Sequence, residues 1–325
     1  FAPSCGWLNM PYLFGSLEEF RKLVDLMWDQ HNAWAVKESG ARVLAIVDIG
    51  YRQLTTDAAH PVRNLADARG LTVRTPQNAL AVSAFNALGF KPHPASFADT
   101  YGMLAKGTVS GQEGCFNNVV TMKFADHQKY ATCINYAVHS ANIIVNEEWL
   151  QSLPEQARDA LIRAGREAMA YERTKVSQML VADDRALQEQ GMELLGVVED
   201  LSEWTRLGRT SWLKCYDVLG YGNADKGKAI MAVVLSKKEA LANAWEDWLR
   251  QPPATRLAAC ETPYKKRSLR GSAFLCLGRD GLLNVLYTIP CCGCPEAWLG
   301  AELGAVSVEA GSGMRPTARV RYSRV

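Results

Sequence analysis

The spacing of apolar residues predicts that a helix followed by a strand lies near the start of the chain. The apolar residues that recur at intervals of three and four are Leu17, Phe20, Leu23, Val24 and Met27. This spacing places them on one face of a helix over 16–34, with Ser16 as the N-cap. Ala41–Val47 then forms a short apolar run, which is typical of a buried strand in a mostly parallel sheet. Helix followed by strand indicates the α/β class.

The same alternation continues through the middle of the chain. The elements it predicts are a short helix at 64–68, a strand at 71–74, a helix at 77–88 that ends at Gly89, a helix at 97–105 and a strand around 143–145. From Pro154 to about Gln190, one apolar face persists with Gly165 as the only glycine. A helix of about 35 residues is roughly 50 Å long. Such a helix is long enough to brace two lobes.

Length and composition set the broad class of the protein. The chain has 325 residues, enough for two domains, and its net charge of +2 gives no reason to expect nucleic acid or an anionic membrane surface as a partner. No apolar run approaches the length of about 18 residues that a membrane-spanning helix needs. After Pro252 and Pro253 the periodicity is lost. We therefore expect residues 251–325 to be a tail of doubtful structure.

No catalytic or metal-binding motif is present in the sequence. The five histidines have no metal-ligand spacing, and the nine cysteines do not form a zinc-ligand set. We therefore predict no metal and no cofactor. A serine and a histidine brought together by folding stay open as an alternative, because pairing through space is invisible in one sequence.

Two arginines are the strongest candidates for ligand contacts. Arg52 follows the apolar run 45–47, and Arg74 ends the strand 71–73. Both positions suggest the carboxyl end of a strand, where open α/β sheets bind ligands. A guanidinium offers a planar fork of donors that matches a carboxylate.

The alternative is that each arginine forms a surface ion pair with Asp57 or Asp67, which is the commoner fate of an arginine. Arg74 has apolar neighbours on one side and Pro76 on the other, so for this residue a surface ion pair and a contact with a ligand are equally good interpretations. A further set of candidates is Phe97, Tyr101, Gln112, Glu113 and Asn117. Phe97 and Tyr101 are also spaced as a pair within a helical core.

Four stretches carry a resemblance to a known family. They are MPYLF at 10–14, GYRQLT at 50–55, GLTVRTP at 70–76, and the segment from ALGFKPHP to GQE at 87–113. In order and spacing they resemble the substrate-binding proteins of tripartite ATP-independent periplasmic (TRAP) transporters, of the C4-dicarboxylate-binding type. The likeness covers about residues 7–245 and does not include the tail.

The resemblance implies a two-lobed periplasmic-binding-protein-like (type II) fold with a long helix shared between the lobes. Lobe I would comprise 1–51 and 140–178, and lobe II 52–139 and 179–250. It also implies a periplasmic solute receptor, not an enzyme, that closes on an organic acid and delivers it to TRAP membrane permease subunits. The chain starts where family members have completed the first part of lobe I. We therefore expect that lobe to be incomplete and the tail to be an extension or out-of-frame sequence.

The resemblance also assigns roles to individual residues. In the family, the arginine at the position of Arg74 forms the paired contact with the ligand carboxylate. Arg52 would make a second polar contact, and Phe97 would form a wall of the site. Gly114 and Asn135 complete the predicted set of ligand contacts. Gly114 departs from the family, which has an asparagine there, so one usual side-chain contact is missing.

Two other interpretations remain at this point. An enzyme could act on a small carboxylate on the same scaffold, with His93 or Glu113 as its base, since a fold does not fix a function. The chain could also be a non-functional fragment. Whether Cys115 and Cys133 pair in an oxidising compartment stays open as well.

Overall fold

The fold is that of a computed structural model, which describes residues 2–250 and four short strands nearer the C-terminus. The chain divides into two units, Phe1–Leu241 and Ala242–Val325. The four strands are β7 (Phe274–Leu277), β8 (Leu283–Leu286), β9 (Val306–Val308) and β10 (Val320–Tyr322). β7 pairs with β8 and β9 with β10, both antiparallel. The remainder of the tail predicted over 251–325 lies outside the described residues.

A six-stranded sheet in the order β3-β2-β4-β1-β5-β6 forms the centre of the first unit. Its strands are β1 (Ala41–Thr56), β2 (Thr72–Thr75), β3 (Lys91–Pro94), β4 (Gly111–Gly114), β5 (Tyr130–Asn146) and β6 (Glu193–Val197). β1 is antiparallel to both of its neighbours, while the other three pairs are parallel. The sheet is thus mostly parallel, as predicted, but β1 is its antiparallel member. An apolar run shows that a strand is buried, but it does not give the direction of the strand.

The helices of the first unit follow the predicted pattern closely. They are η1 (Pro3–Asn9), α1 (Leu17–Ser39), α2 (Leu65–Ala68), α3 (Ala79–Ala87), α4 (Thr100–Ala105), α5 (Phe116–Thr121), η2 (Phe124–Asp126), α6 (Glu147–Ser152), α7 (Glu155–Glu189), α8 (Leu201–Thr210), α9 (Trp212–Leu219) and α10 (Ala224–Arg250), which continues past the boundary at Leu241. The N-cap prediction for α1 is confirmed, because the Ser16 hydroxyl accepts a hydrogen bond from the Glu19 amide at 3.0 Å. Gly89 follows α3 with φ of 90°, as predicted for a left-handed C-cap.

None of the helices in the described part of the chain is long and apolar enough to cross a membrane.

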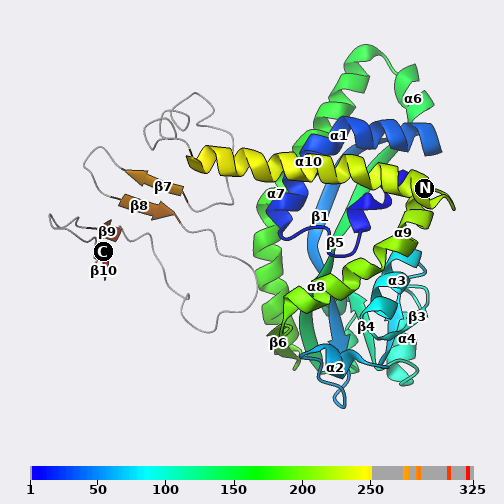
Figure 1. The fold of residues 1–325 in the computed structure, drawn as a ribbon, viewed down its shortest axis with the longest axis vertical. Coiled ribbons are helices and arrows are strands. Elements are labelled where there is room, and N and C mark those ends of the chain that lie inside the picture. Colours follow the sequence, from blue (N-terminus) through cyan, green and yellow to red (C-terminus); the bar gives the residue numbers. More distant parts are fainter. Residues whose placement is uncertain (1, 251–273, 278–282, 287–305, 309–319, 323–325) are drawn as a thin grey trace. The chain divides into compact units, whose positions relative to one another are not determined.

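The two long strands β1 and β5 run through more than one hydrophobic core (Figure 1). Near the start of β1, Val43 and Ile46 pack in a cluster with side chains of η1, α1, α9 and α10. Near its end, Leu54 packs in a second cluster with side chains of α3 and α8. A third cluster lies among α4, α5, η2 and the end of α7. One pair of strands therefore connects cores that are otherwise built from different helices.

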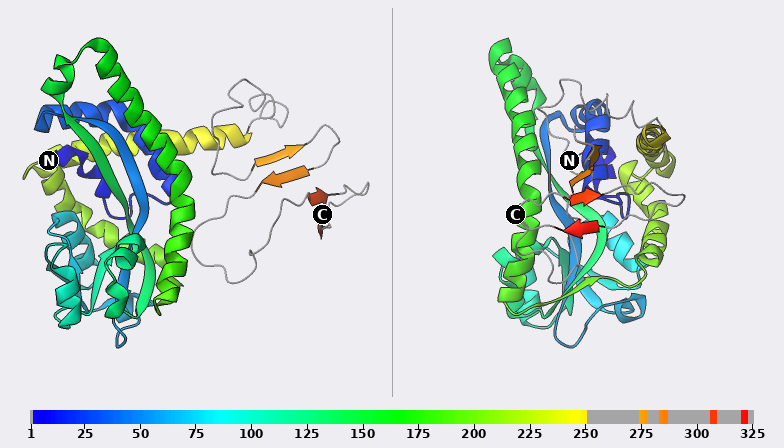
Figure 2. Two further views of the ribbon diagram at one scale, coloured as in Figure 1. Left: turned by 180° about the vertical axis from the view of Figure 1, so that it is seen from behind. Right: turned by 90° about the vertical axis from the view of Figure 1, so that its left-hand side faces the viewer.

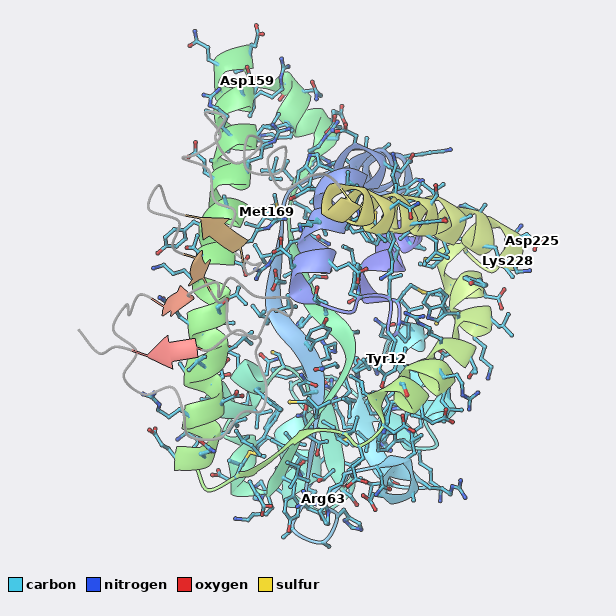
Figure 3. The ribbon with its side chains drawn as sticks, turned by 60° about the vertical axis from the view of Figure 1, so that its left-hand side comes forward. Tyr12, Arg63, Asp159, Met169, Asp225 and Lys228 are labelled. Atoms are coloured by element: carbon cyan, nitrogen blue, oxygen red, sulfur yellow. The ribbon has the colours of Figure 1, made fainter. Side chains whose placement is uncertain are left out.

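The residue boundaries of the two lobes stay a prediction. Residues of α9 and α10, which the sequence assigned to lobe II, pack in the first cluster with residues of α1. Figure 3 marks the extent of this unit, with Asp159 toward the N-terminal end of α7 and Arg63 in the loop after β1 at the opposite end.

The predicted long helix is confirmed as α7, which has 35 residues and runs along the sheet (Figure 2). Gly165 allows its closest approach, since a Cβ there would lie 2.5 Å from the Leu44 carbonyl oxygen of β1. Farther along, Leu180 fills the space beside Gly50, which has φ of 87° at a shift in the β1 register. The helix thus contacts β1 both before this irregularity, at Leu44, and at the irregularity itself, at Gly50.

A buried acidic group lies where α1, β1 and α7 meet. Arg21 forms a two-bond salt bridge with Asp48, with distances of 2.8 and 3.1 Å. Both carboxylate oxygens of Glu172 are buried without a hydrogen-bond partner in the described residues. Burial and the nearby Asp48 carboxylate raise the pKa of Glu172 to about 7, although Arg21 opposes the shift. Glu172 is therefore a carboxyl that the fold favours in its protonated form.

We expect Gly165→Ala to destabilise the protein by about 1–3 kcal/mol, because the added methyl group would collide with the backbone of β1. The matched control is Gly102→Ala in α4, where a Cβ would have no neighbour within 4 Å. That change should be neutral or slightly stabilising. Urea unfolding of the three chains measures both effects, and an equal free energy of unfolding for Gly165→Ala and the wild type would contradict the close contact.

Glu172→Gln should change the pH dependence of stability. A carboxyl whose pKa is raised on folding stabilises the folded state most below its unfolded pKa, and this contribution is lost as the pH rises through about 7. Wild type and variant should therefore unfold alike near pH 4.5, and the variant should be more stable at pH 8 by on the order of 1–2 kcal/mol. Thermal unfolding across this range is the measurement. The control is Glu167→Gln, at an exposed position of the same helix, and a pH-independent difference for Glu172→Gln would contradict the assignment.

Candidate functional site

The carboxyl ends of three parallel strands meet at one edge of the sheet. β2 pairs in parallel with both β3 and β4, so that Arg74 lies opposite His93 on one side and Gln112 on the other. Just past β3, the Ala95 amide donates a hydrogen bond to the Thr75 carbonyl oxygen at 2.9 Å. The predicted position of Arg74 at the end of a strand is confirmed. This edge of an open sheet is where ligands usually bind.

Arg74 is a buried guanidinium without a carboxylate partner among the described residues. It is only 3% exposed. Its Nε and Nη2 atoms donate hydrogen bonds to one acceptor, the Ala95 carbonyl oxygen, at 3.2 and 2.7 Å. The guanidinium carbon lies 5.9 Å from the centre of the Phe97 ring. Burial lowers the pKa of Arg74, and the positive charge of Arg52 acts in the same direction, while Glu113, Tyr136 and Asp99 partly oppose the shift.

The surface ion pairs considered from the sequence are absent for Arg74. Asp57 pairs instead with His60 at 2.7 Å. Asp67 accepts hydrogen bonds from the backbone amides of Arg63 and Asn64. Arg74 therefore retains an uncompensated positive charge at the edge of the sheet.

Arg52 lies at the same edge for a different reason from the predicted one. It does not follow β1 but lies inside that strand, because β1 continues beyond Gly50 to Thr56. Its Nε and Nη2 atoms donate to the two carboxylate oxygens of Glu113, each at 2.7 Å. The side chain of Glu113 is fully buried. The surface ion pair with Asp57 or Asp67 is therefore wrong for Arg52, which forms a buried ion pair with Glu113 instead.

Tyr136 of β5 completes a buried triad with these two residues. Its hydroxyl donates to Glu113 Oε2 at 2.6 Å and accepts from Arg52 Nε at 3.1 Å. Burial alone would lower the pKa of Arg52, but Glu113 and Tyr136 outweigh it and the pKa is raised well above its usual value. Burial and the Glu113 carboxylate raise the pKa of Tyr136. The triad thus consists of a positively charged Arg52, a negatively charged Glu113 and an uncharged Tyr136.

The predicted contacts Gly114 and Asn135 flank Gln53 of β1. Gly114 is the residue paired with Gln53 across the sheet. The Gln53 amide donates to Asn135 Oδ1 at 2.7 Å, and the Asn135 backbone amide donates to Gln53 Oε1 at 2.9 Å. Asn135 has φ of 46°, in the left-handed region that asparagine tolerates. A Cβ at Gly114 would lie 3.2 Å from the terminal oxygen of Gln112, so a side chain fits there with a small shift of Gln112.

Phe97 and Tyr101 do not form the core pair that their spacing also allowed. They are 41% and 37% exposed, and α4 begins only at Thr100. Phe97 packs edge-on against Phe124, with ring centres 6.1 Å apart, while the Tyr101 hydroxyl donates to Asp126 at 2.8 Å. Phe97 therefore presents an exposed aromatic surface beside Arg74.

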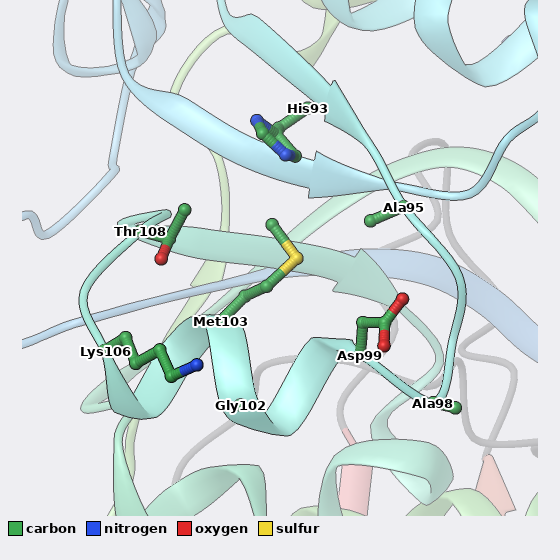
Figure 4. A pocket seen from close by; sticks show the side chains of 8 residues that line it. All are labelled: His93, Ala95, Ala98, Asp99, Gly102, Met103, Lys106 and Thr108. Atoms are coloured by element: carbon green, nitrogen blue, oxygen red, sulfur yellow. The ribbon is translucent and has the colours of Figure 1, made fainter.

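A cavity of about 530 Å³ lies between β3 and α4 (Figure 4). Its lining residues are His93, Ala95, Ala98, Asp99, Gly102, Met103, Lys106 and Thr108. Ala95 is the link between this cavity and the Arg74 guanidinium, because its carbonyl oxygen accepts the Arg74 hydrogen bonds. Arg52, Phe97 and Asn135 are not among the lining residues. The cavity is therefore adjacent to the predicted contacts but does not contain them.

Sequence reasoning missed Tyr136, Gln53 and His139. Burial, and then the charge of Arg52, lower the pKa of His139 to about 4, and its Nδ1 atom has no hydrogen-bond partner in the described residues. The proximity of Tyr136 and His139 to the two arginines depends on the pairing of β1 with β5, which are distant in sequence. The only signal in the sequence was that these residues are polar and lie within otherwise apolar strands.

The described cysteines provide neither a disulfide nor a metal site. Cys5, Cys115, Cys133 and Cys215 are buried and outside any disulfide. Burial raises the pKa of Cys115. Over the described residues, no group of three or more His, Cys, Asp or Glu side chains is arranged to hold a metal ion.

Comparison with known proteins adds independent information. The model of a family described as bacterial extracellular solute-binding protein, family 7, matches residues 1–217. The chain is 30% identical over 196 residues to the 2,3-diketo-L-gulonate-binding periplasmic protein of Escherichia coli K12, a match that covers 60% of this chain and 58% of that protein. A C4-dicarboxylate-binding periplasmic protein of Vibrio cholerae is 24% identical over 211 residues, covering 63% of this chain and 62% of that protein. The chain thus spans less than two thirds of the length of these relatives.

Solved structures show the same fold. A TRAP periplasmic solute-binding protein of Rhodobacter sphaeroides, in an apo open form, matches with a TM-score of 0.65 and 30% identity, over 73% of this chain and 76% of that one. A second, from Roseobacter denitrificans with bound L-galactonate, matches with a TM-score of 0.60 and 25% identity, over 66% and 70% of the two chains. The expectation of the two-lobed type II fold is confirmed.

Tyr136→Phe should destabilise the protein by about 1–2 kcal/mol, since it removes a buried hydroxyl that bonds to both members of an ion pair. Tyr101→Phe is the matched control, because its hydroxyl bonds to a carboxylate at the surface and should contribute less than about 0.5 kcal/mol. Chemical unfolding measures the difference. Equal effects of the two changes would contradict a role for the triad in stability.

Proposed function

The chain belongs to the bacterial extracellular solute-binding proteins of family 7, and on that premise we propose that it is the solute receptor of a TRAP transporter. In this proposal it binds an organic acid in the periplasm and delivers it to the membrane permease subunits of the transporter. The ligands of its relatives support the choice of ligand class: 2,3-diketo-L-gulonate and L-galactonate are both organic acids.

The observation that carries the proposal is the state of Arg74. A guanidinium that is 3% exposed and has only a carbonyl oxygen as its hydrogen-bond partner keeps donors and a full charge available. A ligand carboxylate is the group that matches both the free hydrogen-bond donors and the positive charge of Arg74. Binding it would compensate a charge that the described residues leave unpaired. We therefore assign the carboxylate contact to Arg74.

The other predicted residues take supporting roles in the proposed site. Phe97 lies beside the Arg74 guanidinium and offers its exposed ring as a wall. Arg52 reaches the same edge of the sheet, but its fork of donors is already occupied by Glu113. Asn135 and Gly114 lie on either side of Gln53, where they would contact the polar part of the ligand.

The geometry favours binding over catalysis. Glu113, one of the two candidate bases, is fully buried and is engaged by Arg52 and by the Tyr136 hydroxyl. His93, the other candidate, lines the neighbouring cavity. The described residues thus support binding of a carboxylate through Arg74, as a receptor requires.

Arg74→Ala should abolish or strongly weaken binding of organic acids. Loss of a buried charge-assisted contact costs about 2–5 kcal/mol, equivalent to a fall in affinity of roughly 30-fold or more. Isothermal titration of L-galactonate and 2,3-diketo-L-gulonate against the 325-residue chain measures the change. The control is Arg63→Ala, which removes an exposed arginine that pairs with Glu193 at 3.4 Å and should leave binding unchanged. An unaltered affinity in Arg74→Ala would remove this residue from the site.

A further inference from the structure

The charge balance around Arg74 also predicts which organic acids fit. We propose that the site selects acids carrying one negative charge over acids of the same skeleton carrying two. This inference rests on the proposed function, because it concerns the same site and the same carboxylate contact, Arg74. It sets the chain apart from those relatives whose names specify C4-dicarboxylates.

The two arginines differ in how much charge they leave for a ligand. Arg74 bonds to a neutral carbonyl oxygen, so its positive charge is uncompensated. The charge of Arg52 is cancelled by Glu113 through two hydrogen bonds of 2.7 Å. Although two guanidinium groups lie at this edge of the sheet, only one unit of positive charge remains for the ligand.

The other ionisable groups near Arg74 add no positive charge to this sum, and the Asp99 carboxylate reduces it. Tyr136 is neutral and donates its proton to Glu113. His139 is also neutral near pH 7, because burial and the charge of Arg52 hold its pKa at about 4. Asp99 is exposed and accepts a hydrogen bond from Ser96, and its negative charge would oppose a second carboxylate.

A ligand with two carboxylates would meet one of two obstacles. Its second carboxylate could stay uncompensated in a partly buried site, which is unfavourable. Otherwise it would have to draw Arg52 away from Glu113, leaving a fully buried carboxylate with only the Tyr136 hydroxyl. A monocarboxylate whose remaining groups are hydroxyls or amides meets neither obstacle. The buried Arg52–Glu113–Tyr136 triad thus acts as a selectivity element of the site.

Two pairs of ligands isolate the effect of one charge. Succinamate and succinate have nearly the same shape and differ by replacement of one carboxylate with an amide. L-Galactonate and galactarate share a six-carbon skeleton and differ by one terminal carboxylate. We expect the singly charged member of at least one pair to bind the wild-type chain at least about tenfold more tightly in calorimetric titration at pH 8, where every carboxylate of these free ligands is ionised.

Variants of the triad provide the second measurement. Glu113→Gln keeps the shape of the side chain but releases the charge of Arg52, so the preference for the singly charged ligand should fall about tenfold or reverse. The control is Arg63→Ala, which removes an exposed arginine that pairs with Glu193 and leaves Arg52 and Glu113 unchanged, so the preference should stay as in the wild type. Circular dichroism shows which variants fold. If Glu113→Gln does not fold, the ligand pairs on the wild-type chain still decide.

The outcomes separate this inference from the proposed function. Equal or tighter binding of the doubly charged ligand to the wild-type chain would overturn the selectivity while leaving the receptor function intact. An unchanged preference in folded Glu113→Gln would also overturn the role of the triad. If no acid of either pair, nor 2,3-diketo-L-gulonate, binds at all, both the proposed function and this inference fail.

Discussion

The antiparallel pairing of β1 with β5 is the constraint on which the rest of the first unit depends. These strands have 16 and 17 residues and run from the cluster around α1 to the clusters around α3 and α5. Their register shifts in three places, near Leu44, near Gly50 and near Gln53. Without this pairing the two ends would have no common backbone, and Tyr136 would not reach Arg52. The position of the site is therefore a consequence of long-range strand pairing.

Local patterns predicted much of the fold because the information they carry is local. The apolar period of α1, the Ser16 cap and Gly89 after α3 each depend on residues within one or two turns. The direction and length of β1 could not be read in this way. Its main partner is β5, about 90 residues later, and Gly50 resembles the end of a strand when only its neighbours are considered. At Gly50 the chain continues through a shift in register instead of stopping.

The same distinction explains how much of the candidate site was predictable. Arg74 could be placed because its strand ends at Pro76, a local signal. The state of Arg52 depends on Glu113 and Tyr136, which lie 61 and 84 residues away. Two arginines in similar sequence contexts therefore have opposite electrostatic roles. One is neutralised within the fold, and the other keeps its charge, so residue type and motif alone did not distinguish them.

The length of α7 has a mechanical consequence. Its contacts with β1 at Gly165 and Leu180 are 15 residues apart, about 22 Å along the axis, and the second of them lies at the shift in register at Gly50. Because the helix is in contact with β1 at two such points, it can be treated as a rigid rod with two points of contact. If one end of a helix roughly 50 Å long were fixed, a tilt of only about 5° would move its other end by about 4 Å. Small angular adjustments at the bulge are therefore amplified into displacements comparable to the size of a bound acid.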